Sequence, residues 1–201
     1  MSTPPSALSC LSAWPSAEVR FLVGIGGASG AVYGVRFLKR CPGEKHLILS
    51  RGGEQVLRLE TGLGGGDLAA EVRSAHDDRN LAAPWSSGSN RHDGFIIIPC
   101  SLSTLGKIGS GIADTLITRA AQVALKERMP LIVCVRETPW STITLRRALE
   151  VSEAGGIVMP VAPPWYRDPE SMEAVVDGFC DKVLGVLGVS RAPGWREEEL
   201  G

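Results

Sequence analysis

Residues 21–38 read FLVGIGGASGAVYGVRFL. In this stretch a short apolar run breaks into glycines at residues 24–30 and resumes as a helix-like segment. A strand, a glycine-rich turn and a helix in this order leave backbone N–H groups at the positive end of the helix, which suits a phosphate-bearing or anionic ligand. Ser29 adds a hydroxyl group in the middle of the turn. The stretch therefore predicts a ligand site at the start of the fold.

Length, charge and cysteine usage narrow the class of protein. The chain has 201 residues and a formal net charge of −1, which suits one compact domain and gives no electrostatic argument for nucleic acid or an anionic membrane. No apolar run has the length needed to span a bilayer. The five cysteines include no CxxC pair, and the three histidines show no ligand spacing. We therefore expect a cytoplasmic protein with reduced thiols and no metal site.

The chain divides into three parts by composition. Residues 1–18 are rich in Ser, Pro and Ala and lack the basic start and long apolar stretch of a secretory signal, so we expect a disordered N-terminal extension. Residues 19–189 are expected to form the single folded domain, and residues 190–201 a charged C-terminal tail.

Strand-like and helix-like segments alternate along the folded domain. The expected strands are short continuous apolar runs, typical of strands buried on both faces, at residues 19–25, 45–50, 94–99, 131–135 and 156–159. Helices are expected at residues 29–40, 53–60, 101–111, 114–128, 142–154 and 171–187. This alternation predicts a doubly wound α/β fold, with a mainly parallel sheet and helices on both faces. Residues 61–67 and 76–93 resist the pattern and are expected to be irregular loops.

The glycine turn matches the dinucleotide-binding pattern GxGxxG imperfectly, because Ser29 stands in the place of the last glycine. An NAD site also needs an acidic residue at the end of the second strand, where it holds the ribose hydroxyls. Here that strand ends in Ser50 and Arg51. These residues argue against NAD and leave NADP or a mononucleotide open. A plain strand–helix connection is the structural alternative.

A second turn of the same kind follows the third expected strand, where Cys100 leads into residues 101–106, SLSTLG. Hydroxyl groups and N–H groups at a helix start suit a phosphate, although Ser101 or Ser103 could equally serve only as a helix cap. In a doubly wound sheet the first and third strands commonly flank the topological switch point. The two turns would then open into one crevice.

Charged residues follow the later strands. Arg136 and Glu137 end the fourth expected strand, where a guanidinium could hold a phosphate and a carboxylate could move protons, unless the two simply pair with each other. Arg119 and Lys126 share one face of a helix, which is either a solvated face or a surface for a phosphate or a neighbouring subunit. Tyr166 lies in a Pro-rich aromatic loop that either packs or lines a pocket.

Taken in order, these residues resemble the UbiX-type flavin prenyltransferases, older members of which were called aromatic acid decarboxylases. The resemblance spans residues 19–189. It is carried by GASGA at 27–31, PCS at 99–101 with TL at 104–105, RAA at 119–121, LKER at 125–128, RETP at 136–139, and Tyr166. In that order and spacing the motifs are highly specific to the family.

The resemblance implies an enzyme that joins a dimethylallyl group from dimethylallyl phosphate to N5 and C6 of reduced FMN, with no metal. The product, prenylated FMN, would serve a partner decarboxylase of the UbiD type. The resemblance also implies a homo-oligomer, commonly a dodecamer built from trimers, with active sites at subunit junctions. It leaves open whether the donor is the monophosphate or the pyrophosphate.

The resemblance also implies roles for single residues. FMN would be bound by Gly27, Ala28, Ser29, Ser50, Ser101, Leu102, Ser103, Thr104 and Arg136. The phosphate of the prenyl donor would be held by Lys126, Arg136, Tyr166 and Lys182. Ser29 and Glu137 would be catalytic, with Glu137 as the proton carrier and Ser29 as a relay or orienting group. Lys182 stands where some relatives have arginine, which keeps the charge but gives up a bidentate fork.

Two other functions stay open at this point. Flavin-dependent cysteine decarboxylases share the expected fold, but they use a histidine in the first helix region and an Asn-containing turn. This chain has no histidine in residues 29–40, and its corresponding turn reads PCSLST. A non-catalytic flavin carrier would use the same crevice as the enzyme, so the sequence does not separate the two.

Overall fold

The computed structural model describes residues 19–189 and Arg196. The predicted N-terminal extension and, apart from Arg196, the predicted C-terminal tail lie outside these residues. The strands are β1 (Arg20–Ile25), β2 (Glu44–Leu49), β3 (Ser74–Asp77), β4 (Gly94–Cys100), β5 (Leu131–Val135) and β6 (Ile157–Pro160). The helices are α1 (Ala31–Arg40), α2 (Arg51–Thr61), α3 (Leu102–Gly109), α4 (Leu116–Lys126), α5 (Thr142–Glu153) and α6 (Met172–Val186). Short 3₁₀ helices are η1 (Gly65–Glu71), η2 (Pro84–Ser86) and η3 (Trp165–Arg167).

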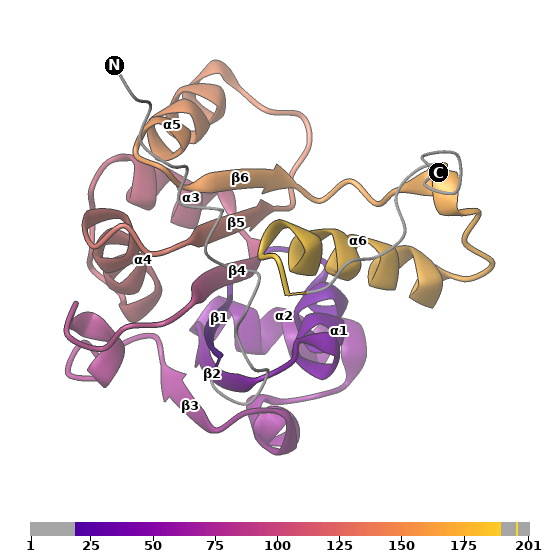
Figure 1. Ribbon diagram of the computed structural model, residues 1–201, viewed down its shortest axis with the longest axis horizontal. Coiled ribbons are helices and arrows are strands. Elements are labelled where there is room, and N and C mark those ends of the chain that lie inside the picture. The colour runs from indigo at the N-terminus through magenta and orange to yellow at the C-terminus, as the bar shows by residue number, and fades with distance from the viewer. Residues whose placement is uncertain (1–18, 190–195, 197–201) are drawn as a thin grey trace.

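All six strands are parallel and form one sheet in the order β3-β2-β1-β4-β5-β6 (Figure 1). The order reverses between β1 and β4, so these two strands flank the switch point. The predicted doubly wound α/β fold is confirmed, and the expected first and third strands are indeed the neighbours at the reversal.

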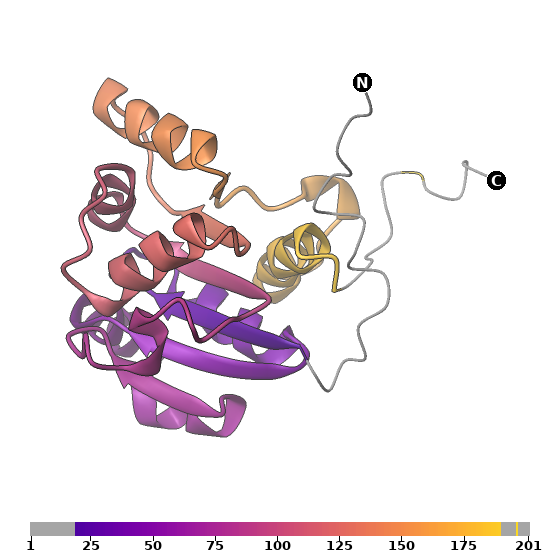
Figure 2. The same cartoon turned by 60° about the vertical axis from the view of Figure 1, so that its left-hand side comes forward.

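Helices cover both faces of the sheet (Figures 1 and 2). On one face, α1, α2 and α6 bury side chains against strand residues such as Val23 and Ile96. On the other face, α3 and α4, with Val151 of α5, pack against the alternate residues, such as Phe95 and Ile97. Residues that face one layer of helices alternate along each strand with residues that face the other layer. This is expected, because successive side chains of a strand point to opposite faces of the sheet. None of the described helices is long and apolar enough to cross a membrane.

The two stretches expected to be irregular loops are partly regular. Ser74–Asp77 forms the edge strand β3, paired with β2, and the segment after it is anchored by Trp85, which is buried on α4. η1 continues the first of these stretches. The sequence of β3, SAHD, alternates between half-buried and exposed positions and contains no apolar run. It therefore lacks the pattern by which the buried strands were predicted.

Glycines let α1 and α2 approach the central strands closely. A Cβ atom at Gly34 in α1 would lie 2.7 Å from the carbonyl oxygen of Ile98, and one at Gly53 in α2 would collide with the carbonyl oxygen of Ile25. Real Cβ atoms essentially never come so near to backbone atoms. The two helices can therefore start directly above the ends of β1 and β4 only because these positions have no side chain.

We predict that Gly34→Ala destabilises the protein by about 1–3 kcal/mol, because α1 must move away from Ile98. Gly106→Ala in α3 is the matched control, since a Cβ atom there meets nothing within 4 Å. The control should be neutral or stabilising by up to about 1 kcal/mol, as expected for alanine in a helix. Urea unfolding of both variants measures the difference. Equal stability of the two variants would contradict the close packing of α1.

The three histidines of the chain gather around β3. The Nδ1 atom of His46 lies 2.7 Å from the hydroxyl oxygen of Ser74, which lies 2.8 Å from Nε2 of His76. The rings of His46 and Trp85 are 4.6 Å apart between centroids, and His92 lies behind Trp85. His92 is 6% exposed, and its Nδ1 atom has no hydrogen-bond partner within the part of the chain that the structure describes. Burial, together with Arg91 nearby, lowers the pKa of His92 to about 4.

This lowered pKa predicts acid sensitivity. Below pH 6.5 the unfolded chain protonates His92 while the folded protein keeps it neutral, so the free energy of unfolding falls as the pH drops toward 4. Between pH 7 and pH 5 the loss from this residue should be about 2 kcal/mol. Urea unfolding at both pH values should show a smaller loss for His92→Leu than for the wild type. Identical losses would contradict the assignment.

Candidate active site

Backbone hydrogen bonds connect the central strands at their carboxyl ends. Three backbone hydrogen bonds link their turns, from Ser50 to Ile25 (3.1 Å), from Gly26 to Pro99 (3.1 Å) and from Arg136 to Cys100 (3.1 Å). The segments that follow β2, β1, β4 and β5 therefore lie side by side along one edge of the sheet. All nine residues predicted to bind flavin come from these four segments.

The turn after β1 is built from closely packed backbone. A Cβ atom at Gly27 would lie 3.1 Å from Cα of Gly52 at the start of α2, which is a tight contact with backbone. Within residues 19–189, the N–H groups of Gly27, Ala28 and Ser29 donate to no protein acceptor. Gly30 has a φ of 96°, in the left-handed region, and leads into α1. The turn thus offers consecutive N–H groups to an anion.

The start of α1 is occupied by a carboxylate of the protein itself. Glu60, near the end of α2, accepts hydrogen bonds on Oε2 from the N–H groups of Gly30 (2.8 Å) and Ala31 (2.9 Å). Burial acts to raise the pKa of Glu60, but the Ser29 hydroxyl, these two N–H groups and Arg136 outweigh it and lower the pKa overall. The start of α1, which the sequence predicted as part of a ligand site, is therefore already capped by Glu60. Glu60 is a site residue that sequence reasoning missed.

A partial signal for Glu60 was present in the sequence. α1 has a glycine at its N-cap and no acidic residue in its first turn, so its terminus needs an anion from elsewhere. The anion is the carboxylate of Glu60, which is 30 residues from Gly30 in the sequence. Only the packing of α2 beside α1 brings the two together.

Arg136 and Glu137 stand after β5 and do not pair with each other within the described residues. Arg136 packs over the glycine turn, and its Nε atom donates to the carbonyl oxygen of Ser29 at 2.9 Å. Glu137 is exposed, and among the described residues its side chain accepts only from the N–H group of Thr138, at 3.0 Å. The guanidinium is thus fixed at the turn, while the carboxylate lies at the open rim where a proton could be exchanged.

The predicted serine ligands also act as helix caps. The hydroxyl oxygen of Ser50 accepts from the N–H group of Gly53 at 2.9 Å, and that of Ser101 accepts from the N–H group of Thr104 at 3.3 Å. Ser101 also lies 3.1 Å from the Thr104 hydroxyl oxygen. Leu102, Ser103 and Thr104 form the first turn of α3. Of the two serines that the sequence offered as caps, Ser101 caps α3 and Ser103 does not, and Ser50 is a cap that was not predicted. A hydroxyl group can cap a helix and donate its hydrogen to a ligand at once.

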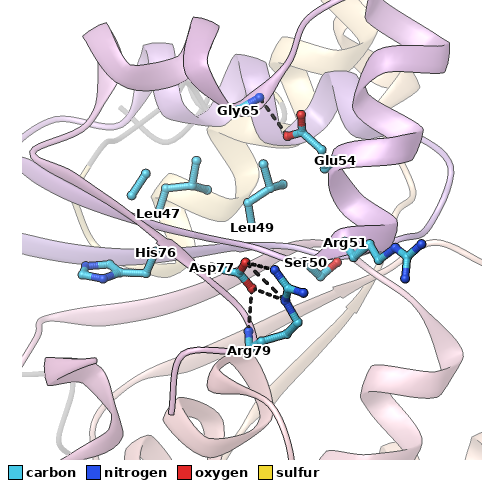
Figure 3. A pocket seen from close by; sticks show the side chains of 10 residues that line it. Leu47, Leu49, Ser50, Arg51, Glu54, Gly65, His76, Asp77 and Arg79 are labelled. Atoms are coloured by element: carbon cyan, nitrogen blue, oxygen red, sulfur yellow. Dashed lines mark hydrogen bonds and ion pairs between the residues drawn. The ribbon is translucent and has the colours of Figure 1, made fainter. Parts of the chain in front are cut away.

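A cavity of about 470 Å³ lies beside the crevice, over the carboxyl ends of β2 and β3 (Figure 3). Leu47 and Leu49 supply apolar surface, and Arg51 projects from the start of α2. On its rim Arg79 pairs with Asp77 at 2.6 Å, which lowers the pKa of Asp77 to about 2. Ser50 contributes to this cavity and to the row of turns, so it marks the boundary between the two.

Comparison with known proteins decides the family. The family model for flavoproteins matches residues 13–184. Flavin prenyltransferase UbiX from Deinococcus radiodurans is 42% identical over 191 residues, which cover 92% of this chain and 97% of the relative. The chain belongs to the UbiX flavin prenyltransferase family. The enzyme of the same name from Escherichia coli (strain K12) is also 42% identical, over 85% of this chain and 93% of the relative.

Solved UbiX structures share the architecture. The crystal structure of AnUbiX (PadA1) in complex with FMN and dimethylallyl pyrophosphate has a TM-score of 0.83 and 38% identity, and covers 89% of this chain and 99% of that chain. A dodecameric FMN-dependent UbiX-like decarboxylase from Escherichia coli gives the same TM-score and identity over 88% of this chain and all of that one. The cysteine decarboxylase TvaF is similar in fold alone, at 17% identity and a TM-score of 0.55.

One chain of this UbiX family member does not assemble all four residues predicted to hold the donor phosphate. Lys126 ends α4, just before β5 begins at Leu131, whereas Arg136 follows the other end of that strand. The two cations therefore lie at opposite edges of the sheet. Lys126 forms an ion pair with Glu127. Tyr166 in η3 is 49% exposed, and Lys182 on α6 is exposed as well.

Replacing Glu60 by glutamine tests the cap on α1. Glutamine keeps the shape but loses the charge, so we predict a loss of at most about 1 kcal/mol in the free energy of unfolding at pH 7, since Glu60 is exposed. Because the pKa of Glu60 is lowered by folding, the difference from the wild type should shrink as the pH falls below the ordinary glutamate range. Urea unfolding at pH 7 and pH 4 measures both values. A difference that grows toward low pH would contradict the cap.

Proposed function

We propose that this chain is a flavin prenyltransferase that joins a dimethylallyl group from dimethylallyl phosphate to N5 and C6 of reduced FMN. Its product, prenylated FMN, serves a decarboxylase of the UbiD type. One observation carries the proposal: Arg136, which Glu137 follows in the sequence, is hydrogen-bonded to the glycine turn after β1, in a chain that is 38% identical to a UbiX protein solved with FMN and dimethylallyl pyrophosphate. That relative supports the phosphate esters of dimethylallyl alcohol as the donor class.

The residues at the switch point suit FMN. The N–H groups of Gly27, Ala28 and Ser29 have no protein acceptor in the described chain, and hydroxyl groups stand at Ser50 and at the start of α3. Since Glu60 fills the start of α1, an anionic group of the flavin would use the preceding turn instead. The full set of proposed flavin ligands is Gly27, Ala28, Ser29, Ser50, Ser101, Leu102, Ser103, Thr104 and Arg136. Reduced FMN, when bound, supplies the nucleophilic ring atoms.

Cations of the protein assist departure of the phosphate. Positive charge beside the leaving oxygen atoms stabilises the anion that develops there, and this electrostatic contribution is usually the largest in such a site. Arg136 is held at the crevice by Ser29, and Tyr166 and Lys182 complete the set within the chain. Lys126 lies at the other edge of the sheet, so we propose that it serves the site of a neighbouring subunit. This requires a homo-oligomer, for which a dodecameric relative gives support.

Proton movement is proposed for two carboxylates and one hydroxyl group. Glu137, exposed at the rim, exchanges a proton with solvent and with the reacting centre. The Ser29 hydroxyl group helps to lower the pKa of Glu60, and a proton would pass between these two neighbouring groups. Glu60 thus joins Ser29 and Glu137 as a proposed catalytic residue.

We also propose that the reaction takes place in the cytoplasm. Cys41, Cys100, Cys134 and Cys180 are all buried free thiols. Burial raises the pKa of Cys41 and Cys180 to about 12, which keeps these thiols protonated and unreactive. Structural thiols of this kind are ordinary in a reducing compartment.

The test of the function is anaerobic incubation of the purified protein with reduced FMN and dimethylallyl phosphate. Mass spectrometry of the extracted flavin should show one added prenyl unit, and a parallel reaction with the pyrophosphate ranks the two donors. Recovery of unmodified FMN from both reactions would overturn the proposal.

We predict that Glu137→Gln lowers the rate of prenylated FMN formation by about 100-fold or more, because it removes the carboxylate that exchanges protons. FMN affinity should stay within about twofold of the wild type, since Glu137 is at the rim. Glu150→Gln on α5, which removes a surface partner of Arg147, is the control and should leave the rate unchanged. Full activity of Glu137→Gln would show that this residue carries no proton.

A further inference from the structure

Residues 161–168, which we call the strap, connect the last strand to the last helix. The strap begins beside the end of β5, because the N–H group of Val161 donates to the carbonyl oxygen of Val135 at 2.9 Å. It contains η3 with Tyr166 and leads to α6, the helix of Lys182. The strap therefore runs from the neighbourhood of Arg136 to the helix that carries another proposed donor ligand.

Apolar burial contributes little to the position of η3. None of its residues is buried, and Trp165 is 68% exposed. A segment with so little buried surface needs specific contacts to hold one position. Specific contacts with α6 include the following two.

The first contact is between Pro164 and Gly178. A Cβ atom at Gly178 would lie 3.3 Å from Cγ of Pro164, so the absence of a side chain lets the strap lie directly on the helix. Gly178 and Lys182 are four residues apart and share a face of α6. The strap thus crosses α6 one turn before Lys182.

The second contact is an ion pair. Nη1 of Arg167 lies 3.3 Å from Oδ2 of Asp181, with side chains 26% and 18% exposed. The other carboxylate oxygen of Asp181 accepts from Nε of Arg40 in α1 at 3.0 Å. Asp181 is therefore oriented from α1 and binds the strap with its second oxygen. A partly buried pair held from both sides is stronger than an isolated surface pair.

Neighbouring ion pairs make α6 a firm support for the strap. Arg36 in α1 binds Asp177 of α6 with two nitrogen atoms, at 2.7 and 2.6 Å. Arg40 bridges Asp177 and Asp181. Removing the Arg167–Asp181 pair should thus release the strap while α6 stays on α1.

We propose that Arg167 and Asp181 are positioning residues of the donor site, which hold the strap on α6 and so fix Tyr166 relative to Lys182 for the phosphate of the prenyl donor. Each member of the pair is adjacent in sequence to one of these two ligands. The inference rests on the proposed function, because that function assigns Tyr166 and Lys182 to the donor. It adds two residues that do not themselves touch the substrate.

The experiment uses the whole protein loaded with oxidised FMN, so that no turnover occurs. Arg167→Gln, Asp181→Asn and the double variant are compared with the wild type, and Arg147→Gln removes an unrelated surface pair as the control. Calorimetry gives the Kd for dimethylallyl phosphate, a flavin titration gives FMN affinity, and hydrogen exchange reports opening of residues 161–168. Arg167→Gln leaves the bond between Asp181 and Arg40 in place, so it isolates the strap.

Each single variant should weaken donor binding about tenfold and speed exchange in the strap, with FMN affinity within twofold of the wild type. The double variant should be no weaker than the worse single variant, and Asp181→Glu should restore part of the affinity. Unchanged donor binding in the folded single variants would overturn the inference, and so would a parallel loss of FMN affinity. If the wild type binds the donor but forms no prenylated FMN, the proposed function fails. The binding measurements would still show whether Arg167 and Asp181 position the strap for the donor.

Discussion

The structure depends on how closely the backbone of its neighbours can approach the carboxyl end of β1. A side chain at Gly53 would collide with the carbonyl oxygen of Ile25, and a Cβ atom at Gly27 would press tightly on Gly52. This packing sets α2 beside the start of α1, so Glu60 can reach the N–H groups there. Among residues 19–189, the N–H groups of the preceding turn are left without protein acceptors. The close packing of the backbone therefore lets Glu60 cap the start of α1, and it leaves the preceding turn available to a ligand.

The sequence predicts the parts of the structure that follow from local pattern. Continuous apolar runs identified five of the six strands, and the turn after β1 with the one after β4 predicted the switch-point crevice. The prediction that all five are buried on both faces was wrong for β6, which lies at the edge of the sheet and has no buried residue. The edge strand β3 was missed because its four residues pair with only one neighbour and carry no apolar run. Glu60 was missed because its role arises from the packing of two helices, which no local spacing reveals.

Strand direction explains why the donor ligands divide among separate parts of the molecule. In a parallel sheet, residues before and after the same strand lie at opposite edges, so Lys126 and Arg136 cannot meet within one chain. Assembly is the route by which the fold can bring the missing cation to the site. Within the chain, the strap links the end of β5 to α6, and so connects the neighbourhood of Arg136 with the helix that carries Lys182. We therefore propose that the turns at the carboxyl ends of the strands bind the flavin, and that the donor is bound by elements that need an anchor or a partner subunit.

A crystal structure of the protein with FMN tests this account most directly, because the chain offers two neighbouring sites at the same edge of the sheet. The account predicts electron density for the flavin over the ends of β1 and β4, in contact with the turn that contains Ser29 and with the first turn of α3. Flavin bound instead in the cavity over Leu47 and Leu49, away from Ser29 and Arg136, would contradict it.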